Sequence, residues 1–234
     1  MNLTKKKFFI FDFDGVLINS TSIGCQKMQL ILEKLGLPPI PQSFLSQHWG
    51  KKVLDLFELV SKEVGATPDQ TKKMIEIDQL ISSGLPYKFE NELFVALNNL
   101  KLFNYYAGLI TNRSNSSLNS VAKQTGMNFR LFDKIQTTDH YYHHKPDGRV
   151  FGPFTNWAKT RGIKPGEMVY FGDTISQDLK ATRDFSPSLD FVGVVSGINT
   201  REEFLDAGVP LCRIVDFGKL PNFLHNIIRE KVET

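Results

Sequence analysis

The chain has 234 residues and a formal net charge of +3, with 41% hydrophobic and 23% charged residues. These values are typical of a globular protein whose core needs no disulfides, and the length fits one domain with a modest insert. The basic residues are dispersed apart from Lys5-Lys6-Lys7, which argues against a nucleic-acid-binding surface.

The N-terminal region contains one short apolar run, Phe8–Phe11, which Asp12 and Asp14 interrupt. That run is too short for a signal peptide or a membrane span, so we expect no membrane association and a cytoplasmic location. Cys25 and Cys212 are far apart and outside any metal-type spacing. This favours two free cysteines over a disulfide or a nucleophile.

The chain is predicted to open with one strand and to continue with a long helical stretch. The strand is expected over Phe8–Phe11, because a continuously apolar run is typical of a parallel strand buried on both faces. Residues 20–84 then show only helical periodicity and capping signals. These predict helices around Met28–Leu35, over Val53–Val64, and from a capping box at Thr67–Gln70 to about Gly84. We therefore expect a helical insert at residues 20–85 within a core made of residues 1–19 and 86–234.

After Pro86, strand and helix patterns alternate. Helical patterns lie near Glu90–Lys101, from Ser114, over Phe151–Arg161 and from a capping box at Thr200–Glu203. Strand patterns lie at Tyr105–Ile110, Leu131–Ile135, Met168–Phe171 and Phe191–Val195. This alternation predicts an α/β fold, with a mainly parallel, Rossmann-like sheet and helices on both of its faces.

Reactive side chains follow four of the five predicted strands. They are Asp12 and Asp14 after the first, Thr111 and Asn112 after the second, Lys145 in the loop after the third, and Asp173 and Asp178 after the fourth. In such sheets, ligands bind beyond the carboxyl ends of the strands. We therefore expect these side chains to converge at one edge of the sheet.

The acidic residues predict a cation site. Asp12 and Asp14 are two positions apart on extended backbone, so their side chains can point to the same side. Together with Asp173 and Asp178 they would form an oxygen-rich site that suits Mg²⁺. Asp178 has two further interpretations, which are that it orients Lys145 or that it caps the following helix.

The same residues predict phosphoryl-transfer chemistry. Asp12, kept ionised by the cation, can attack phosphorus, and Lys145 can neutralise the phosphoryl oxygens as their charge redistributes. Thr111 can donate a hydrogen bond to another of these oxygens. Asp14 can protonate the leaving alcohol and then deprotonate the water that cleaves the phospho-aspartate.

The segments that carry these residues resemble, in order, the four motifs of the haloacid dehalogenase (HAD) superfamily. The segments are Phe11–Leu17, Leu109–Asn112, Lys145–Asp147 and Phe171–Asp178. Residues 13–110 leave room for a helical cap between the first two motifs, whereas residues 112–144 leave none before the third. This spacing resembles the branch of phosphoglycolate-phosphatase-like and β-phosphoglucomutase-like enzymes.

The resemblance implies a HAD-type phosphoric monoester hydrolase with a Rossmann-like core and an all-helical cap. Its expected substrate is a small phosphorylated metabolite, hydrolysed with Mg²⁺ through a phospho-aspartate, and the sequence leaves the oligomeric state open, with a monomer among the options. Asn19 and Gly148 depart from the aspartate and proline common in this branch. Neither position performs the chemistry, but both departures weaken assignment to any one named enzyme.

The resemblance also gives candidates for substrate binding. It implies that Asn112 lies beside the phosphate, with Thr111 and Lys145. Related enzymes carry a glycine-marked substrate loop in the cap, and Trp49-Gly50-Lys51-Lys52 lies at the corresponding place, so Gly50 and Lys51 are further candidates. A plain N-terminal helix turn is the alternative for that loop. Arg113 either reaches the substrate or faces solvent.

Each competing function is distinguished from a phosphatase by one or two features of the sequence or of the reaction. A sugar-phosphate mutase of the same branch would share all four motifs and is the main alternative. Dehalogenases of this family lack the second aspartate and the metal acids, both present here as Asp14 and Asp173. A receiver domain would need about half this length and no helical insert, and a non-catalytic binding protein would have a broken motif. His140, His143 and His144 are interpreted as a solvated loop rather than a metal cluster.

Overall fold

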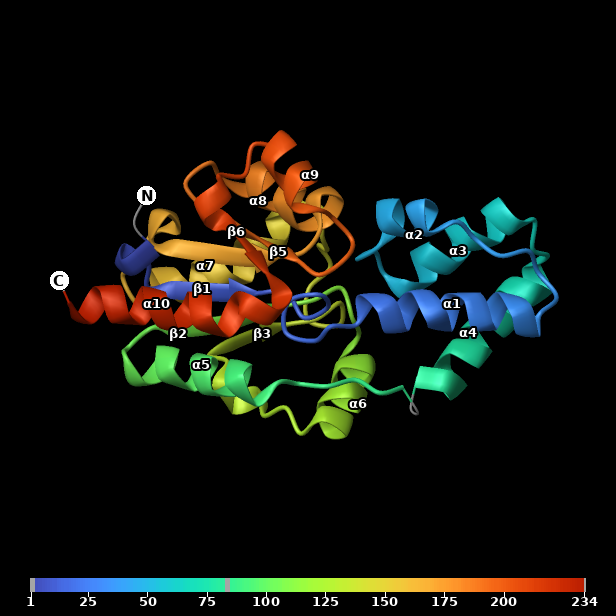
Figure 1. Cartoon of the computed structure of the whole chain (residues 1–234), viewed down its shortest axis with the longest axis horizontal. Helices are drawn as coiled ribbons and strands as arrows, with labels where there is room; N and C mark the ends of the chain where they lie inside the picture. The colour runs from blue at the N-terminus through green and yellow to red at the C-terminus, as the bar shows by residue number, and fades with distance from the viewer. Residues whose placement is uncertain (1–2, 83–84, 234) are drawn as a thin grey trace.

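The computed structural model describes residues 3–82 and 85–233. A six-stranded parallel sheet lies at the centre of its larger part, in the order β3-β2-β1-β4-β5-β6 (Figure 1). The strands are β1 (Phe8–Phe11), β2 (Tyr106–Ile110), β3 (Lys134–Gln136), β4 (Met168–Gly172), β5 (Asp190–Val195) and β6 (Ile214–Asp216). Because β1 pairs with β2 on one side and β4 on the other, the strand order reverses at β1, where such sheets form a ligand crevice.

Helices cover both faces of the sheet. One face packs against α5 (Asn91–Leu102), α6 (Asn115–Thr125) and α10 (Leu220–Val232). The other packs against α7 (Gly152–Lys159), α8 (Lys180–Phe185) and α9 (Arg201–Asp206). Successive residues of β1 alternate between the two cores, with Phe9 and Phe11 in the first and Phe8 and Ile10 in the second. Burial on both faces explains why this strand is continuously apolar.

Seven short helical segments connect these elements. They are η1 (Leu3–Lys5), η2 (Phe129–Leu131), η3 (Gly148–Phe151), η4 (Pro165–Glu167), η5 (Ile175–Leu179), η6 (Leu211–Arg213) and η7 (Phe217–Lys219) among the residues described. The segment η5 is a single π-helical stretch that directly follows β4, and it carries residues of the site described below. None of the described helices is both long and apolar enough to cross a membrane.

Four consecutive helices lie beside the carboxyl edge of the sheet (Figure 1). They are α1 (Thr21–Lys34), α2 (Gln42–His48), α3 (Val53–Val64) and α4 (Pro68–Ser82). They share an apolar cluster of their own, separate from the two cores of the sheet and built around Ile31, Phe57, Val60 and Met74. These helices therefore pack as a unit, which is hereafter called the helical insert.

Most predicted elements are confirmed. Four predicted strands match β1, β2, β4 and β5 to within one residue, and the helix over Val53–Val64 has the predicted bounds. The third strand was placed too early, because Leu131 ends the short helix η2 and the β3 ladder starts at Lys134. The predicted helix end near Gly84 lies outside the described residues. The strand β6 and the helices α2 and α10 were not predicted.

A buried group of charges ties the amino ends of the strands together. Asp190, at the start of β5, lies 2.6 Å from the Lys6 Nζ atom and 2.8 Å from an Arg213 guanidinium nitrogen. All three side chains are buried. Removing one member of a buried ion pair leaves an uncompensated charge, which costs far more than losing an exposed pair.

We expect Asp190→Ala to lower the free energy of unfolding by about 3–5 kcal/mol, because two cations would stay buried without their counter-charge. Urea denaturation measures this. The matched control is Asp216→Ala, which removes the partner of Arg201 and Lys219 at an exposed position and should cost at most about 1 kcal/mol. Equal losses in the two variants would show that the Asp190 group does not stabilise the fold in this way.

Candidate active site

Three carboxylates gather at the carboxyl edge of the sheet. Asp12 directly follows β1, and its backbone N–H donates to the Phe171 carbonyl at 2.8 Å, which brings it beside the end of β4. Asp173 follows β4, and Asp178 lies in η5. One oxygen of each carboxylate lies within 4.8 Å of the others, and all three side chains are buried. The structure thus brings together three of the four predicted metal ligands.

Lys145 lies between two of these carboxylates. Its Nζ donates to Asp12 Oδ1 at 2.8 Å and to Asp178 Oδ1 at 2.7 Å. The Tyr170 hydroxyl donates to the same Asp178 oxygen at 2.7 Å, and Thr174 supplies its backbone N–H and its hydroxyl to the other oxygen. Both Asp178 oxygens are therefore engaged by protein groups, a pattern that favours the interpretation in which Asp178 orients Lys145.

The charges of the three carboxylates and Lys145 favour the binding of a cation. Burial raises the pKa of Asp12 to about 7, and repulsion from Asp178 and Asp14 adds to the effect while Lys145 opposes it. The pKa of Asp173 is raised by burial and then by Asp178 and Asp12. The pKa of Lys145 is raised by Asp12 and Asp178 although burial opposes this. Three carboxylates face one ammonium group, so a bound divalent cation would balance the charge, and oxygen ligands suit such a cation.

We expect a divalent cation to stabilise the protein more at neutral than at acidic pH. Since the folded-state pKa of Asp12 is raised from 3.8 to about 7, the metal-free folded protein loses stability as the pH rises across that window. A cation replaces the bound proton and reverses the loss. The rise in melting temperature on adding MgCl₂ should thus be larger near about pH 8 than near about pH 5. An equal rise at both pH values would contradict this account.

Asp14 takes a different position from the other predicted ligands. Its carboxylate accepts two hydrogen bonds from Arg113, both at 2.7 Å, and one from the Ser20 hydroxyl at 2.6 Å. Burial favours protonation of Asp14, but attraction to Arg113 and these hydrogen bonds outweigh it and lower the pKa. The Asp14 side chain is not part of the carboxylate group found among the described residues. Arg113 is thus engaged within the protein rather than facing solvent.

Thr111 and Asn112 directly follow β2, and Asn112 contacts the backbone of Lys145. The Thr111 hydroxyl oxygen accepts from the Arg113 backbone N–H at 3.1 Å, which leaves its own proton available for donation. The Asn112 amide donates to the carbonyls of Gly50 at 2.7 Å and Lys145 at 3.1 Å, and it accepts from the Lys145 backbone N–H at 3.2 Å. In this structure Asn112 therefore joins the lysine loop to the helical insert rather than presenting free groups to a phosphate.

The loop after α2 brings the helical insert into contact with the core. Gly50 has φ +81°, and a Cβ atom there would lie 3.1 Å from the Gln177 side chain, so glycine permits this close approach. Trp49 fills a notch over Gly24 in α1, where a Cβ atom would lie 2.2 Å from the ring. Trp49 thus anchors the loop, while Lys51 and Lys52 lie on its open side.

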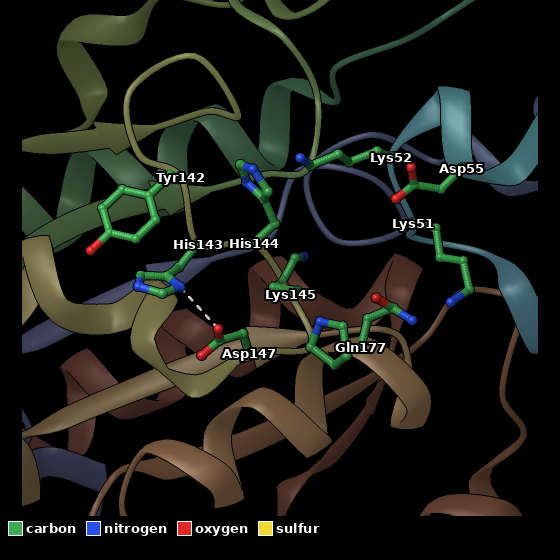
Figure 2. A pocket seen from close by; sticks show the side chains of 10 residues that line it. Lys51, Lys52, Asp55, Tyr142, His143, His144, Lys145, Asp147 and Gln177 are labelled. Carbon is green, nitrogen blue, oxygen red and sulfur yellow. Dashed lines mark hydrogen bonds and ion pairs between the residues drawn. The ribbon is translucent and has the colours of Figure 1, made fainter.

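A pocket of about 220 Å³ lies between the helical insert and the core (Figure 2). Figure 2 shows Lys51, Lys52 and Asp55 on the insert side and the loop from Tyr142 to Asp147 on the core side. The lining residues are Lys51, Lys52, Asp55, Tyr142, His143, His144, Lys145, Pro146, Asp147 and Gln177. The pocket thus adjoins the lysine that contacts Asp12, and it includes the predicted substrate-binding residue Lys51.

The three histidines do not converge on one point. His143 pairs with Asp147 at 2.9 Å, and His140 contacts Thr137 and Asn115. His144 lines the pocket. Within residues 3–82 and 85–233, the three aspartates are the only group of His, Cys, Asp or Glu side chains arranged as a metal site.

Two residues of the site were missed in the sequence. The Ser196 hydroxyl donates to Asp173 Oδ2 at 2.8 Å, and it directly follows β5, so the rule of strand ends could have identified it. Gly15 belongs to the first motif, and a glycine is needed at this position for a structural reason. A Cβ atom there would lie 1.8 Å from Asp173 Oδ2, so only glycine leaves room for that carboxylate.

Comparisons with known proteins extend over most of the chain. A family model described as haloacid dehalogenase-like hydrolase matches residues 9–186. A phosphoglycolate phosphatase of Psychrobacter arcticus is 24% identical over 229 residues, covering 94% of this chain and 96% of that protein. A phosphoglycolate phosphatase of Thiobacillus denitrificans is 26% identical over 216 residues, covering 87% and 91%. The crystal structure of β-phosphoglucomutase from Clostridium difficile has a TM-score of 0.68 at 18% identity, covering 98% of this chain and all of that one, and so shares the fold.

Proposed function

Because the chain belongs to the haloacid dehalogenase-like hydrolase family, we propose that it is a phosphatase that hydrolyses a small phosphate monoester through a phospho-aspartate on Asp12. The relatives named as phosphoglycolate phosphatases support a phosphorylated small molecule as the substrate. The observation that carries the proposal is the buried 2.8 Å contact between Asp12 and Lys145 within a group of three carboxylates. A nucleophile, a cationic group and a cation site thus meet at one point.

The proposed cation is Mg²⁺, held by Asp12 and Asp173, with Asp14 and Asp178 as the further candidate ligands. Its fit is supported by the oxygen-only donor set and by the excess of negative charge over Lys145. When bound, the ion would supply positive charge that keeps Asp12 ionised and offsets the charge of the phosphoryl oxygens. All other roles fall to side chains of this chain.

In the proposed first step, an Asp12 oxygen forms a bond to phosphorus and the bond from phosphorus to the leaving oxygen breaks. Arg113 holds Asp14 ionised in this structure, so Asp14 takes up a proton on leaving Arg113 before it gives that proton to the leaving oxygen. Lys145 and the free hydroxyl proton of Thr111 hold the phosphoryl oxygens. In the second step, Asp14 takes a proton from the water that attacks phosphorus, and Asp12 is released. Arg113 and Ser20 fix the Asp14 carboxylate through three short hydrogen bonds.

The helical insert is proposed to act as a cap over this site, with residues 20–85 as the cap and residues 1–19 and 86–234 as the catalytic core. The contacts of Gly50 with Asn112 and Gln177 support this division, since they place the loop after α2 directly over the carboxyl edge of the sheet. Covering the site excludes bulk water while the phosphoryl group is transferred.

The alternative within the same branch is a sugar-phosphate mutase. The test is a phosphate-release screen of phosphorylated metabolites with Mg²⁺, with Asp12→Asn as the comparison. The proposal expects release by the wild type and none by the variant. Conversion of a sugar phosphate into its isomer without phosphate release would favour the mutase instead.

A further inference from the structure

We propose that Gln177 and Lys51 select the alcohol part of the substrate, and that the chain acts on small phosphorylated hydroxy acids. In such esters the alcohol carries both a carboxylate and a second hydroxyl. This inference rests on the proposed phosphatase function. It concerns the pocket of Figure 2, which Lys145 lines and which would receive the part of the substrate beyond the phosphoryl group.

Gln177 lines this pocket and carries an unused hydrogen-bond acceptor. The residue lies in η5 next to Asp178, is only 2% exposed, and has an Oε1 atom with no hydrogen-bond partner among the described residues. Figure 2 shows its amide between the side chains of Lys51 and Lys145. A buried acceptor without a partner costs free energy, which a donor on a bound molecule would recover. A hydroxyl group of the substrate is such a donor.

The charges that line the pocket favour one anionic group besides the phosphate. Lys145 is engaged with Asp12 and Asp178, and Asp147 is engaged with Arg149 and His143. Both side chains are therefore engaged within the protein. The remaining charged groups of the pocket lie on the helical insert.

Those groups are Lys51, Lys52 and Asp55. Neither lysine has an ion-pair partner within the part of the chain that the structure describes. Burial and then Lys52 lower the pKa of His144, which favours its neutral form. Two cations and one anion leave a single positive charge, which matches one carboxylate.

The pocket is small. Its volume of about 220 Å³ lies below the range of about 300–1,000 Å³ that is typical of sites for drug-sized ligands. The alcohol part of a small hydroxy acid, such as one of three carbons and four oxygens, fits in that space. A two-carbon acid would fill less of it and would leave the Gln177 acceptor unpaired.

Four phosphate esters distinguish the proposed contact of the substrate with Gln177 from its contact with Lys51. They are 3-phosphoglycerate with a carboxylate and a hydroxyl, 2-phosphoglycolate with a carboxylate only, sn-glycerol 3-phosphate with hydroxyls only, and p-nitrophenyl phosphate with neither. The wild type should give its highest kcat/KM with 3-phosphoglycerate.

Gln177→Met keeps the side-chain volume and removes the acceptor. It should lower the ratio of kcat/KM for 3-phosphoglycerate over 2-phosphoglycolate about 3- to 10-fold.

Lys51→Met should lower the ratio of kcat/KM for 3-phosphoglycerate over sn-glycerol 3-phosphate about 10- to 100-fold, because it removes a charged hydrogen bond. The matched control is Lys62→Met, which removes an exposed lysine of α3 away from the pocket and should move neither ratio. Gln177→Met should not lower the melting temperature of the free protein, since the lost acceptor has no partner among the described residues.

A fall of all four activities by the same factor in Gln177→Met, together with a lower melting temperature, would show a purely structural role and overturn the inference. Unchanged ratios in both variants would overturn it too. A different result would contradict the proposed phosphatase function itself. If the wild type with Mg²⁺ releases phosphate from none of the four esters, the phosphatase proposal is wrong, whereas hydrolysis of p-nitrophenyl phosphate without the expected ratios contradicts only the substrate class.

Discussion

Replacing Asp12 with asparagine should lower turnover of every phosphate ester by roughly ten-thousandfold or more, because the proposed nucleophile is lost while the rest of the site stays in place. The amide has the shape of the carboxylate. Its oxygen can still accept from the Phe13 backbone N–H, which donates to Asp12 Oδ1 at 2.7 Å, and from Lys145. The measurement is steady-state phosphate release with Mg²⁺ present.

The melting temperature provides the control for Asp12→Asn. Burial raises the pKa of Asp12, so a charged carboxylate at this position is held at a cost to the folded protein. We therefore expect the metal-free variant to melt no lower than the wild type. A variant that is fully folded and retains more than about a hundredth of the wild-type rate would rule out Asp12 as the nucleophile.

Removing divalent cations should abolish turnover, and added Mg²⁺ should restore it. The carboxylates of Asp12, Asp173 and Asp178 lie together, and Lys145 is the ammonium group that contacts two of them. Without a cation, Asp12 is about half protonated near neutral pH, because burial raises its pKa to about 7, and the neighbouring carboxylates would repel the phosphoryl oxygens. A protonated carboxyl group is a poor nucleophile. The measurement is phosphate release in excess EDTA and after titration with MgCl₂.

Ca²⁺ is the matched comparison for Mg²⁺. It binds oxygen ligands at about 2.3–2.6 Å instead of about 2.0–2.1 Å and with looser geometry, so it should occupy the site without supporting turnover. A melting curve in EDTA shows whether the protein stays folded. Full turnover by folded protein in excess EDTA would be incompatible with the proposed role of the carboxylate group.

The sequence predicts the site best where a strand pattern is followed directly by a chemically reactive residue type. A continuously apolar strand followed at once by Asp12, or by Thr111, marks the carboxyl end of a buried parallel strand. The side chains that the structure brings together at this edge of the sheet are therefore predictable from the sequence alone. The three-residue strand β6 is too short to show a pattern, whereas the buried stripe of α10, from Leu220 to Ile228, does have helical spacing in the sequence.

Contacts between distant loops could not be predicted in this way. The pairing of Asp14 with Arg113 and the contact of Gly50 with Asn112 depend on which loops meet in three dimensions. Neither leaves a periodic signal in the sequence. The unpartnered acceptor of Gln177 is likewise visible only as a balance of donors and acceptors among the described residues of the folded chain.

The central claim is that the phosphoryl group passes through Asp12. Asp14→Asn should make this visible, because it removes the proposed base of the second step but leaves the nucleophile. p-Nitrophenyl phosphate has a leaving group that needs no proton, so the variant should still be phosphorylated. Rapid acid quenching with Mg²⁺ present, followed by mass spectrometry of the peptides, identifies the modified residue. The account predicts a phosphoryl group on Asp12, and none when Asp12→Asn is added. Phosphorylation of another residue, or phosphate release without any phosphorylated Asp12, would contradict it.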